Sequence, residues 1–196
     1  MDTLRIDVIA EAFVVIFVFV ALCAALALVT IALRRPRAGL LAAAGGVVAL
    51  AFVVVAVVPY DVPRLFAIVI AMLGVALAVV GGNPFARWAL TAADGGRTRE
   101  GTRGGILVEL MAEGAHPREE EILRGGTMIG YLERAAVALG VIAGFPAVIA
   151  VVVALKGIGR FTELATPAAR ERFIVGTLAS LLWACAATGL AWLAIW

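Results

Sequence analysis

The residues most able to do chemistry lie in the last third of the chain, where charged side chains interrupt apolar sequence. A charge inside a bilayer costs about 2.5 to 3.5 kcal/mol on insertion scales, so clustered charges there favour a functional site. Basic residues outnumber acidic ones in this region, which predicts a pocket for an anionic ligand. The candidate ligand or ion site comprises Glu133, Arg134, Lys156, Arg160, Glu163, Arg172 and Thr177.

Two other interpretations of these charges stay open. Lys156 and Arg160 can extend to the membrane interface while Glu133 pairs with one of them and holds two helices in register. Alternatively, Glu133 is a proton relay, because a carboxylate in a low-dielectric environment binds a proton more readily unless a cation offsets the desolvation. No histidine is placed to activate Thr177 or Ser180, and no phosphate loop or zinc-ligand set occurs. We therefore predict no catalytic residue, cofactor or metal, and the residues favour a protein that is not an enzyme.

The composition shows which elements must position these residues. Of the 196 residues, 64% are hydrophobic and 15% are charged, and the mean hydropathy is +1.08. These values are typical of a polytopic membrane protein, whose first partner is the lipid bilayer. The net charge of +2 is too small and too scattered for a nucleic-acid surface.

We predict an all-α bundle of six transmembrane helices in two halves. Residues 1–82 form a three-helix half with spans at 12–33, 38–59 and 62–82. Residues 83–124 are expected to be a cytoplasmic loop with short helices over 106–113 and 117–124. Residues 125–196 form a second three-helix half that carries the charged residues and ends with a span at 173–196.

The uncharged run 135–155 has two interpretations. It is long enough to be a single span, which would give five helices, yet Gly144, Phe145 and Pro146 lie at its centre. If these residues form a turn, the loops 34–37, 83–124 and 156–172 share one side and together carry 13 basic residues. The positive-inside rule favours this arrangement, with both termini outside and these loops in the cytoplasm of a bacterium. The expected location is the bacterial inner membrane.

A reversal at residues 144–146 also predicts the register of the charges. Glu133 lies 11 residues before Gly144 and Lys156 lies 10 residues after Pro146. At 1.5 Å per residue, both charges lie about 15 Å from the turn and share a depth. Glycines recur on the face of Glu133, so this face is expected to contact protein. Small residues at four-residue spacing predict close helix packing and subunit contacts in a homo-oligomer, at Gly74, Ala78 and Gly82 and at Gly176, Ser180 and Ala184.

Three segments of the last 70 or so residues carry a resemblance: IGYLER at 129–134, KGIGRFTEL at 156–164 and ERFIVGTLAS at 171–180. They resemble the C-terminal signature of a family of bacterial, actinobacterial-type polytopic membrane proteins without an assigned activity. The resemblance implies no catalytic residue, and it points to the charged residues as the part to test.

Three functions compete. The first is a small inner-membrane protein of the transport or channel type, because transporters use broken helices and charges within the membrane. The second is a membrane-embedded enzyme or binding protein for an anionic lipid or isoprenoid phosphate, because basic pockets at headgroup depth hold phosphates. The third is a structural subunit that docks a partner protein through the loop 83–124. The partners expected besides lipid are an anionic lipid or small anion and further copies of the chain, and no nucleic acid.

Overall fold

The computed structural model describes residues 2–34, 37–58, 60–95, 99–100, 106–110, 118–122, 126–160 and 167–196. These ranges contain six helices and a small sheet. The helices are α1 (Asp2–Arg34), α2 (Ala38–Val57), α3 (Arg64–Asp94), α4 (Gly126–Ile142), α5 (Val148–Arg160) and α6 (Pro167–Ile195). The predicted bundle of six helices is confirmed. The alternative of one span over 135–155 is wrong, because a turn separates α4 from α5.

The apolar helices fit an integral membrane protein. Helices α1, α2, α3 and α6 each contain a segment long and apolar enough to cross a bilayer, whereas α4 and α5 are shorter. Large apolar side chains also point outward from several of the helices, among them Phe13, Met72 and Leu182, each more than two-thirds exposed. Such a surface matches lipid rather than water.

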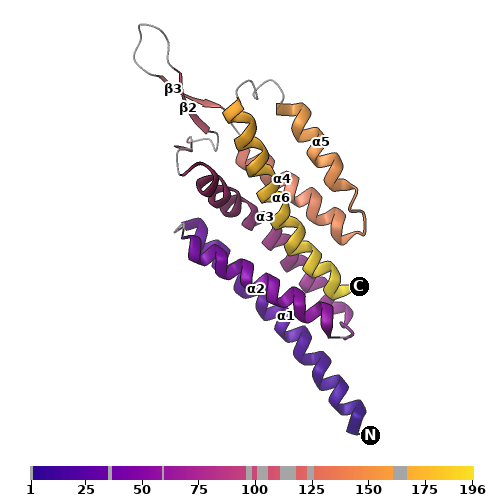
Figure 1. Ribbon diagram of the computed structural model, residues 1–196. Coiled ribbons are helices and arrows are strands. Elements are labelled where there is room, and N and C mark those ends of the chain that lie inside the picture. The colour runs from indigo at the N-terminus through magenta and orange to yellow at the C-terminus, as the bar shows by residue number, and fades with distance from the viewer. Residues whose placement is uncertain are drawn as a thin grey trace.

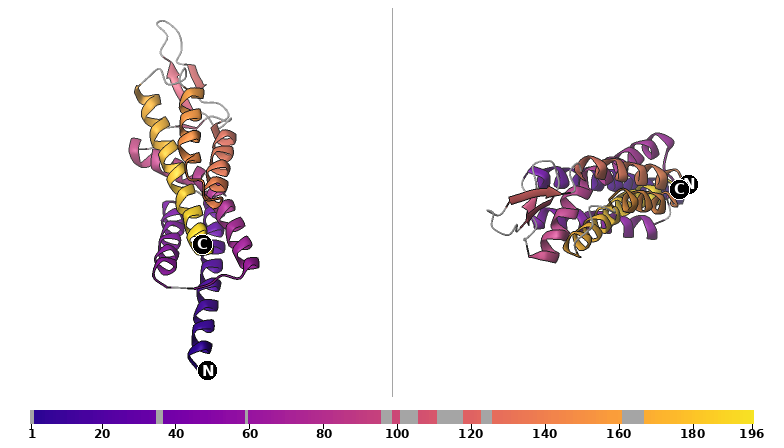
Figure 2. Two further views of the ribbon diagram at one scale, coloured as in Figure 1. Left: turned by 90° about the vertical axis from the view of Figure 1, so that its right-hand side faces the viewer. Right: turned by 90° about the horizontal axis from the view of Figure 1, so that it is seen from above.

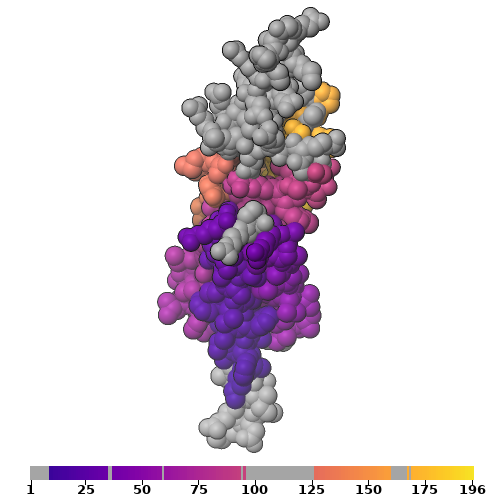
Figure 3. Space-filling model, turned by 90° about the vertical axis from the view of Figure 1, so that its left-hand side faces the viewer, coloured from indigo at the N-terminus to yellow at the C-terminus, as the bar shows by residue number. Residues whose placement is uncertain are grey.

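Helices α3 and α6 form the centre of the bundle (Figure 1). They approach closely, since a Cβ atom added at Gly74 would lie 2.5 Å from the Cβ of Ala191. The α1–α2 hairpin packs on one side of this pair and α4 on the other, with α5 outside α4 (Figure 1). On the face opposite α5, α1 runs along the surface between α2 and α3 (Figure 3).

Helix α3 is longer than the sequence predicted. The expected end of this span at Gly82, with a loop from residue 83, is wrong because the helix continues through Pro84 to Asp94. Proline has no N–H, so the carbonyl of Val80 loses its helical donor. Helix α6 supports this part of α3: the ring of Trp183 stacks on Phe85 with centroids 3.9 Å apart, and its indole N–H donates to the Leu77 carbonyl at 2.9 Å.

The polar segment between α3 and α4 contains strands rather than the short helices predicted over 106–113 and 117–124. Strands β1 (Arg99–Glu100), β2 (Ile106–Leu110) and β3 (Arg118–Ile122) form an antiparallel sheet in the order β1-β2-β3. Ile106 lies opposite Ile122, and Leu110 lies opposite Arg118. Isolated helices this short are marginal in water, whereas pairing gives each strand partners for its backbone groups.

The ends of the elements divide between the two ends of the molecule (Figures 1 and 2). One end of the molecule is called the sheet end below. It holds the sheet, the close of α1, the start of α2, the close of α5 and the start of α6. The α2–α3 turn, the α4–α5 turn and both chain termini lie toward the other. The described residues that flank the loops predicted to be cytoplasmic thus lie toward the sheet end, while the side of the membrane that this end faces stays a prediction.

Candidate functional site

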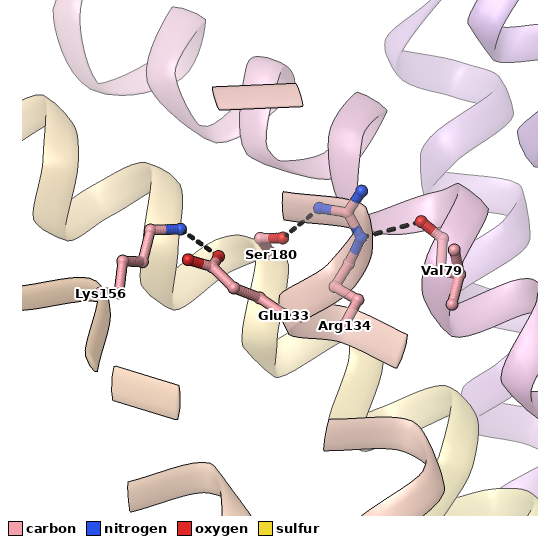
Figure 4. Close-up of polar contacts among 5 residues, drawn as sticks. All are labelled: Val79, Glu133, Arg134, Lys156 and Ser180. Carbon is pink, nitrogen blue, oxygen red and sulfur yellow. Dashed lines mark hydrogen bonds and ion pairs between the residues drawn. The ribbon is translucent and has the colours of Figure 1, made fainter. Parts of the chain in front are cut away.

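Helix α4 presents two neighbouring charges to different parts of the bundle (Figure 4). Successive residues of a helix point about 100° apart. Glu133 therefore faces α5, while Arg134 points between α3 and α6. The charged residues that the sequence grouped into one cluster form two separate arrangements around α4.

The first arrangement is an ion pair between α4 and α5. The Lys156 ammonium donates to the Glu133 carboxylate at 2.5 Å, and the side chains are 17% and 11% exposed, respectively. Lys156 Nζ also lies 5.8 Å from the centroid of the Phe173 ring on α6. The pair confirms the predicted equal depth of the two charges. It also joins the two arms of the hairpin.

The second arrangement is the buried guanidinium of Arg134, which is 2% exposed. Its Nε donates to the Val79 carbonyl of α3 at 2.8 Å, and its Nη1 donates to the Ser180 hydroxyl of α6 at 2.9 Å. The guanidinium carbon lies 5.0 Å from the centroid of the Tyr131 ring. The remaining nitrogen, Nη2, is buried and has no hydrogen-bond partner among the residues that the structure describes. Within the described part of the chain, the hydrogen-bond and ring partners of the guanidinium are thus neutral, and one of its nitrogens remains unsatisfied.

Two glycines make room for this side chain. A Cβ at Gly82 would clash with Arg134 Cδ and would lie 2.7 Å from Nε and 2.8 Å from Ser180 Oγ. A Cβ at Gly130 would lie 3.0 Å from Nη1. The slot for the guanidinium is therefore built from α3, α4 and α6 together.

The other predicted site residues lie apart from this slot or outside the described residues. Thr177 is buried on α6, one turn from Ser180 toward the start of the helix. Arg172 is half-buried nearer that start. Arg160 ends α5, but its side chain and the whole of Glu163 lie outside the described residues. Of the seven predicted residues, the structure joins Glu133 to Lys156 and places Arg134 in a separate slot.

Sequence reasoning missed the partners of Arg134. Gly82 and Ser180 were assigned to helix packing, which is correct but incomplete, because the same small residues also admit and bind the guanidinium. The Val79 carbonyl carries no side-chain signal. Pro84 gives no signal for it either, because the carbonyl that this proline leaves without a helical donor is that of Val80.

Comparison of the chain with protein-family models, with curated proteins and with solved structures gave no match. The resemblance of its last 70 or so residues to bacterial membrane proteins therefore stays a prediction. Within the described ranges, no group of three or more His, Cys, Asp and Glu side chains is placed to hold a metal ion. Among the described residues, the surroundings of Arg134 and the Glu133–Lys156 pair are the two arrangements that indicate a function.

Proposed function

We propose that this chain is an integral membrane protein of the transport class that binds an anion at Arg134. The observation that carries the proposal is the buried guanidinium, which has a free Nη2 and no ion pair among the described residues. Removing an uncompensated charge from water costs several kcal/mol. A bound anion would supply both the counter-charge and an acceptor for Nη2.

Among the described residues, Glu133 forms its ion pair with Lys156 and not with Arg134. Glu133 is adjacent to Arg134 in sequence, but its carboxylate points to α5 and pairs with Lys156 (Figure 4). The three residues together leave one positive charge in excess. This excess favours an anion over a cation as the ligand.

The short helices α4 and α5 favour transport over static binding. Transporters place their ligand sites on interrupted helices, whose ends present backbone groups and dipoles to the ligand. Arg134 lies on such a helix and bridges to the two long helices at the centre of the bundle. Movement of α4 would open the guanidinium to a ligand.

The ligand chemistry is that of a phosphate-like anion, which Arg binds through two parallel N–H groups. Two sources supply it, namely a free anion and an anionic lipid headgroup. Thermal unfolding of the purified protein in neutral detergent distinguishes them, with inorganic phosphate against gluconate at equal ionic strength in one arm and phosphatidylglycerol against phosphatidylcholine in the other. A ligand at 100 times its Kd stabilises the folded state by about 2.7 kcal/mol.

The test compares three variants. Arg134→Gln should abolish the stabilisation, Arg134→Lys should retain part of it because it keeps the charge, and Arg170→Gln, an exposed arginine of α6, is the matched control. In liposomes, flux of the stabilising anion through the wild type and none through Arg134→Gln would support transport. A folded Arg134→Gln protein that the anion stabilises as much as wild type would overturn the site. Binding of the anion without flux would support the site at Arg134 but contradict the transport function.

A further inference from the structure

The α4–α5 hairpin is too short to cross a bilayer twice. Its helices have 17 and 13 residues, or about 26 and 20 Å, against a hydrocarbon core of about 30 Å. Helix α2, with 20 residues, reaches about 30 Å. Beyond the Glu133–Lys156 pair, each arm of the hairpin continues for only about 15 Å before the turn. With this pair at the polar boundary, the turn lies near the middle of the membrane.

The side chains of the turn suit hydrocarbon rather than water. Gly144, Phe145 and Pro146 are exposed, and Phe145 is 58% exposed. No charged residue occurs between 135 and 155. The α2–α3 turn differs, because it carries the exposed charges of Asp61 and Arg64 that a turn at a water boundary is expected to have.

The backbone of the turn is also prepared for an apolar medium. The N–H groups of residues 143–145 donate to carbonyls of α4, and those of 148–151 donate to carbonyls of residues 145–147. Gly144 adopts φ 73°, a left-handed conformation that closes the end of α4. Pro146 has no N–H to satisfy. An unsatisfied backbone group in lipid costs several kcal/mol, so this bonding pattern lowers the cost of a turn inside the bilayer.

The outer face of α5 is apolar from Val151 to Ile158. Val151, Leu155 and Ile158 follow one another at helical spacing and are 52%, 65% and 78% exposed. The α4–α5 turn also stops short of the end at which α6 closes and α3 begins (Figures 1 and 2). The apolar face of α5 and the depth of the α4–α5 turn both fit contact with the lipid of one leaflet.

We infer that α4 and α5 form a re-entrant hairpin, which enters the bilayer from the sheet end and turns back within the hydrocarbon. The protein then crosses the membrane with the four helices α1, α2, α3 and α6. The hairpin begins with α4 and ends with α5 on the side of the sheet. This topology does not depend on the anion proposed for Arg134, because it rests on the length, surface and backbone bonding of the hairpin.

Cysteine labelling of the full-length protein in sealed membrane vesicles tests this topology. The two native thiols, Cys23 and Cys185, are free and are first replaced by alanine. Phe145→Cys then reports on the α4–α5 turn, and Asp61→Cys is the matched control on the α2–α3 turn. Maleimides react with the hydrated thiolate, which hydrocarbon excludes, so we expect labelling of Phe145→Cys at least about tenfold slower than that of Asp61→Cys.

A second measurement gives a positive readout. A fluorophore attached to Phe145→Cys in detergent and returned to vesicles should be quenched more by lipids labelled at the middle of the acyl chain than by lipids labelled at the headgroup. Slow labelling in vesicles with fast labelling in detergent, together with this quenching order, supports the re-entrant hairpin. Labelling as fast as Asp61→Cys from the same side, or stronger quenching from the headgroup, would overturn it.

Discussion

Substitution of Gly82 by alanine tests whether the guanidinium slot sets the stability of the bundle. The added Cβ would clash with Arg134 Cδ and lie 2.7 Å from Nε, whereas ordinary contacts begin at 3.4 Å. It would also lie 2.8 Å from Ser180 Oγ. The Arg134 side chain therefore has to leave its position between α3 and α6.

The expected cost follows from three contributions. Overpacking a tight contact costs about 1 to 3 kcal/mol. Loss of one of the two hydrogen bonds from the charged Arg134, to Val79 or to Ser180, costs about 1.5 to 3 kcal/mol. Alanine favours the helix over glycine by about 0.5 to 1 kcal/mol, which opposes these losses. We expect Gly82→Ala to lower the free energy of unfolding by about 2 to 5 kcal/mol.

Gly46→Ala is the matched control, because no atom lies within 4 Å of an added Cβ at this position of α2. It should be neutral or stabilise by up to about 1 kcal/mol. Both variants are compared by titration with sodium dodecyl sulfate, followed by the fluorescence of the four tryptophans and by helical circular dichroism. Equal free energies of unfolding for Gly82→Ala and Gly46→Ala would refute the role of the guanidinium slot in stability. In an Arg134→Ala background the Gly82→Ala cost should shrink, with a coupling of about 0.5 to 3 kcal/mol.

Three further predictions concern the ion pair, the α2–α3 turn and the α4–α5 turn. Lys156→Gln should destabilise the protein by about 1 to 3 kcal/mol, because it leaves the Glu133 carboxylate half-buried without a partner; adding Glu133→Gln should recover part of this loss in the same unfolding titration. Burial raises the pKa of Tyr60 from its ordinary value of 10.0 to about 12. The unfolded chain therefore loses this proton first, so stability should fall as the pH rises from 10.0 to about 12, by at most about 2 to 3 kcal/mol. Tyr60→Phe should remove this fall, and tyrosinate absorbance should lose its late-titrating component. Gly144→Ala should cost about 1 to 2 kcal/mol, because its φ of 73° is unfavourable for a residue with a Cβ, and Gly157→Ala, where nothing lies within 4 Å, should not.

The helices were predictable where a local signal determines them. The break between α4 and α5 follows from Gly144 and Pro146, since the first adopts a left-handed conformation and the second cannot donate within a helix. The end of α3 was not predictable from composition. Its polar last turns lie beyond the apolar run, and packing of Phe85 against Trp183 of α6 holds the helix together past Pro84. Tertiary contacts of this kind override the local signal.

The candidate site likewise has one part that was predictable from the sequence and one part that was not. The Glu133–Lys156 pair was predictable, because a hairpin with a known turn places residues equally far from that turn at one depth. The partners of Arg134 were not, because Val79 and Ser180 lie 55 and 46 positions away in sequence and no helical period relates them to it. Their approach depends on how α3, α4 and α6 cross. The way these three helices cross is determined by the packing of the whole bundle.

The two side-chain donors near Pro84 differ in charge, and this difference bears on the anion proposed for Arg134. Trp183 donates to the Leu77 carbonyl and Arg134 donates to the Val79 carbonyl, so both serve the stretch of α3 just before the proline. The neutral indole does this without burying a charge. The guanidinium performs the same task at a desolvation cost of several kcal/mol, and its hydrogen bonds to a carbonyl and a hydroxyl supply no counter-charge. A donor for Val79 therefore accounts for the hydrogen bond but not for the charge, and the charge is what the proposed anion at Nη2 would neutralise.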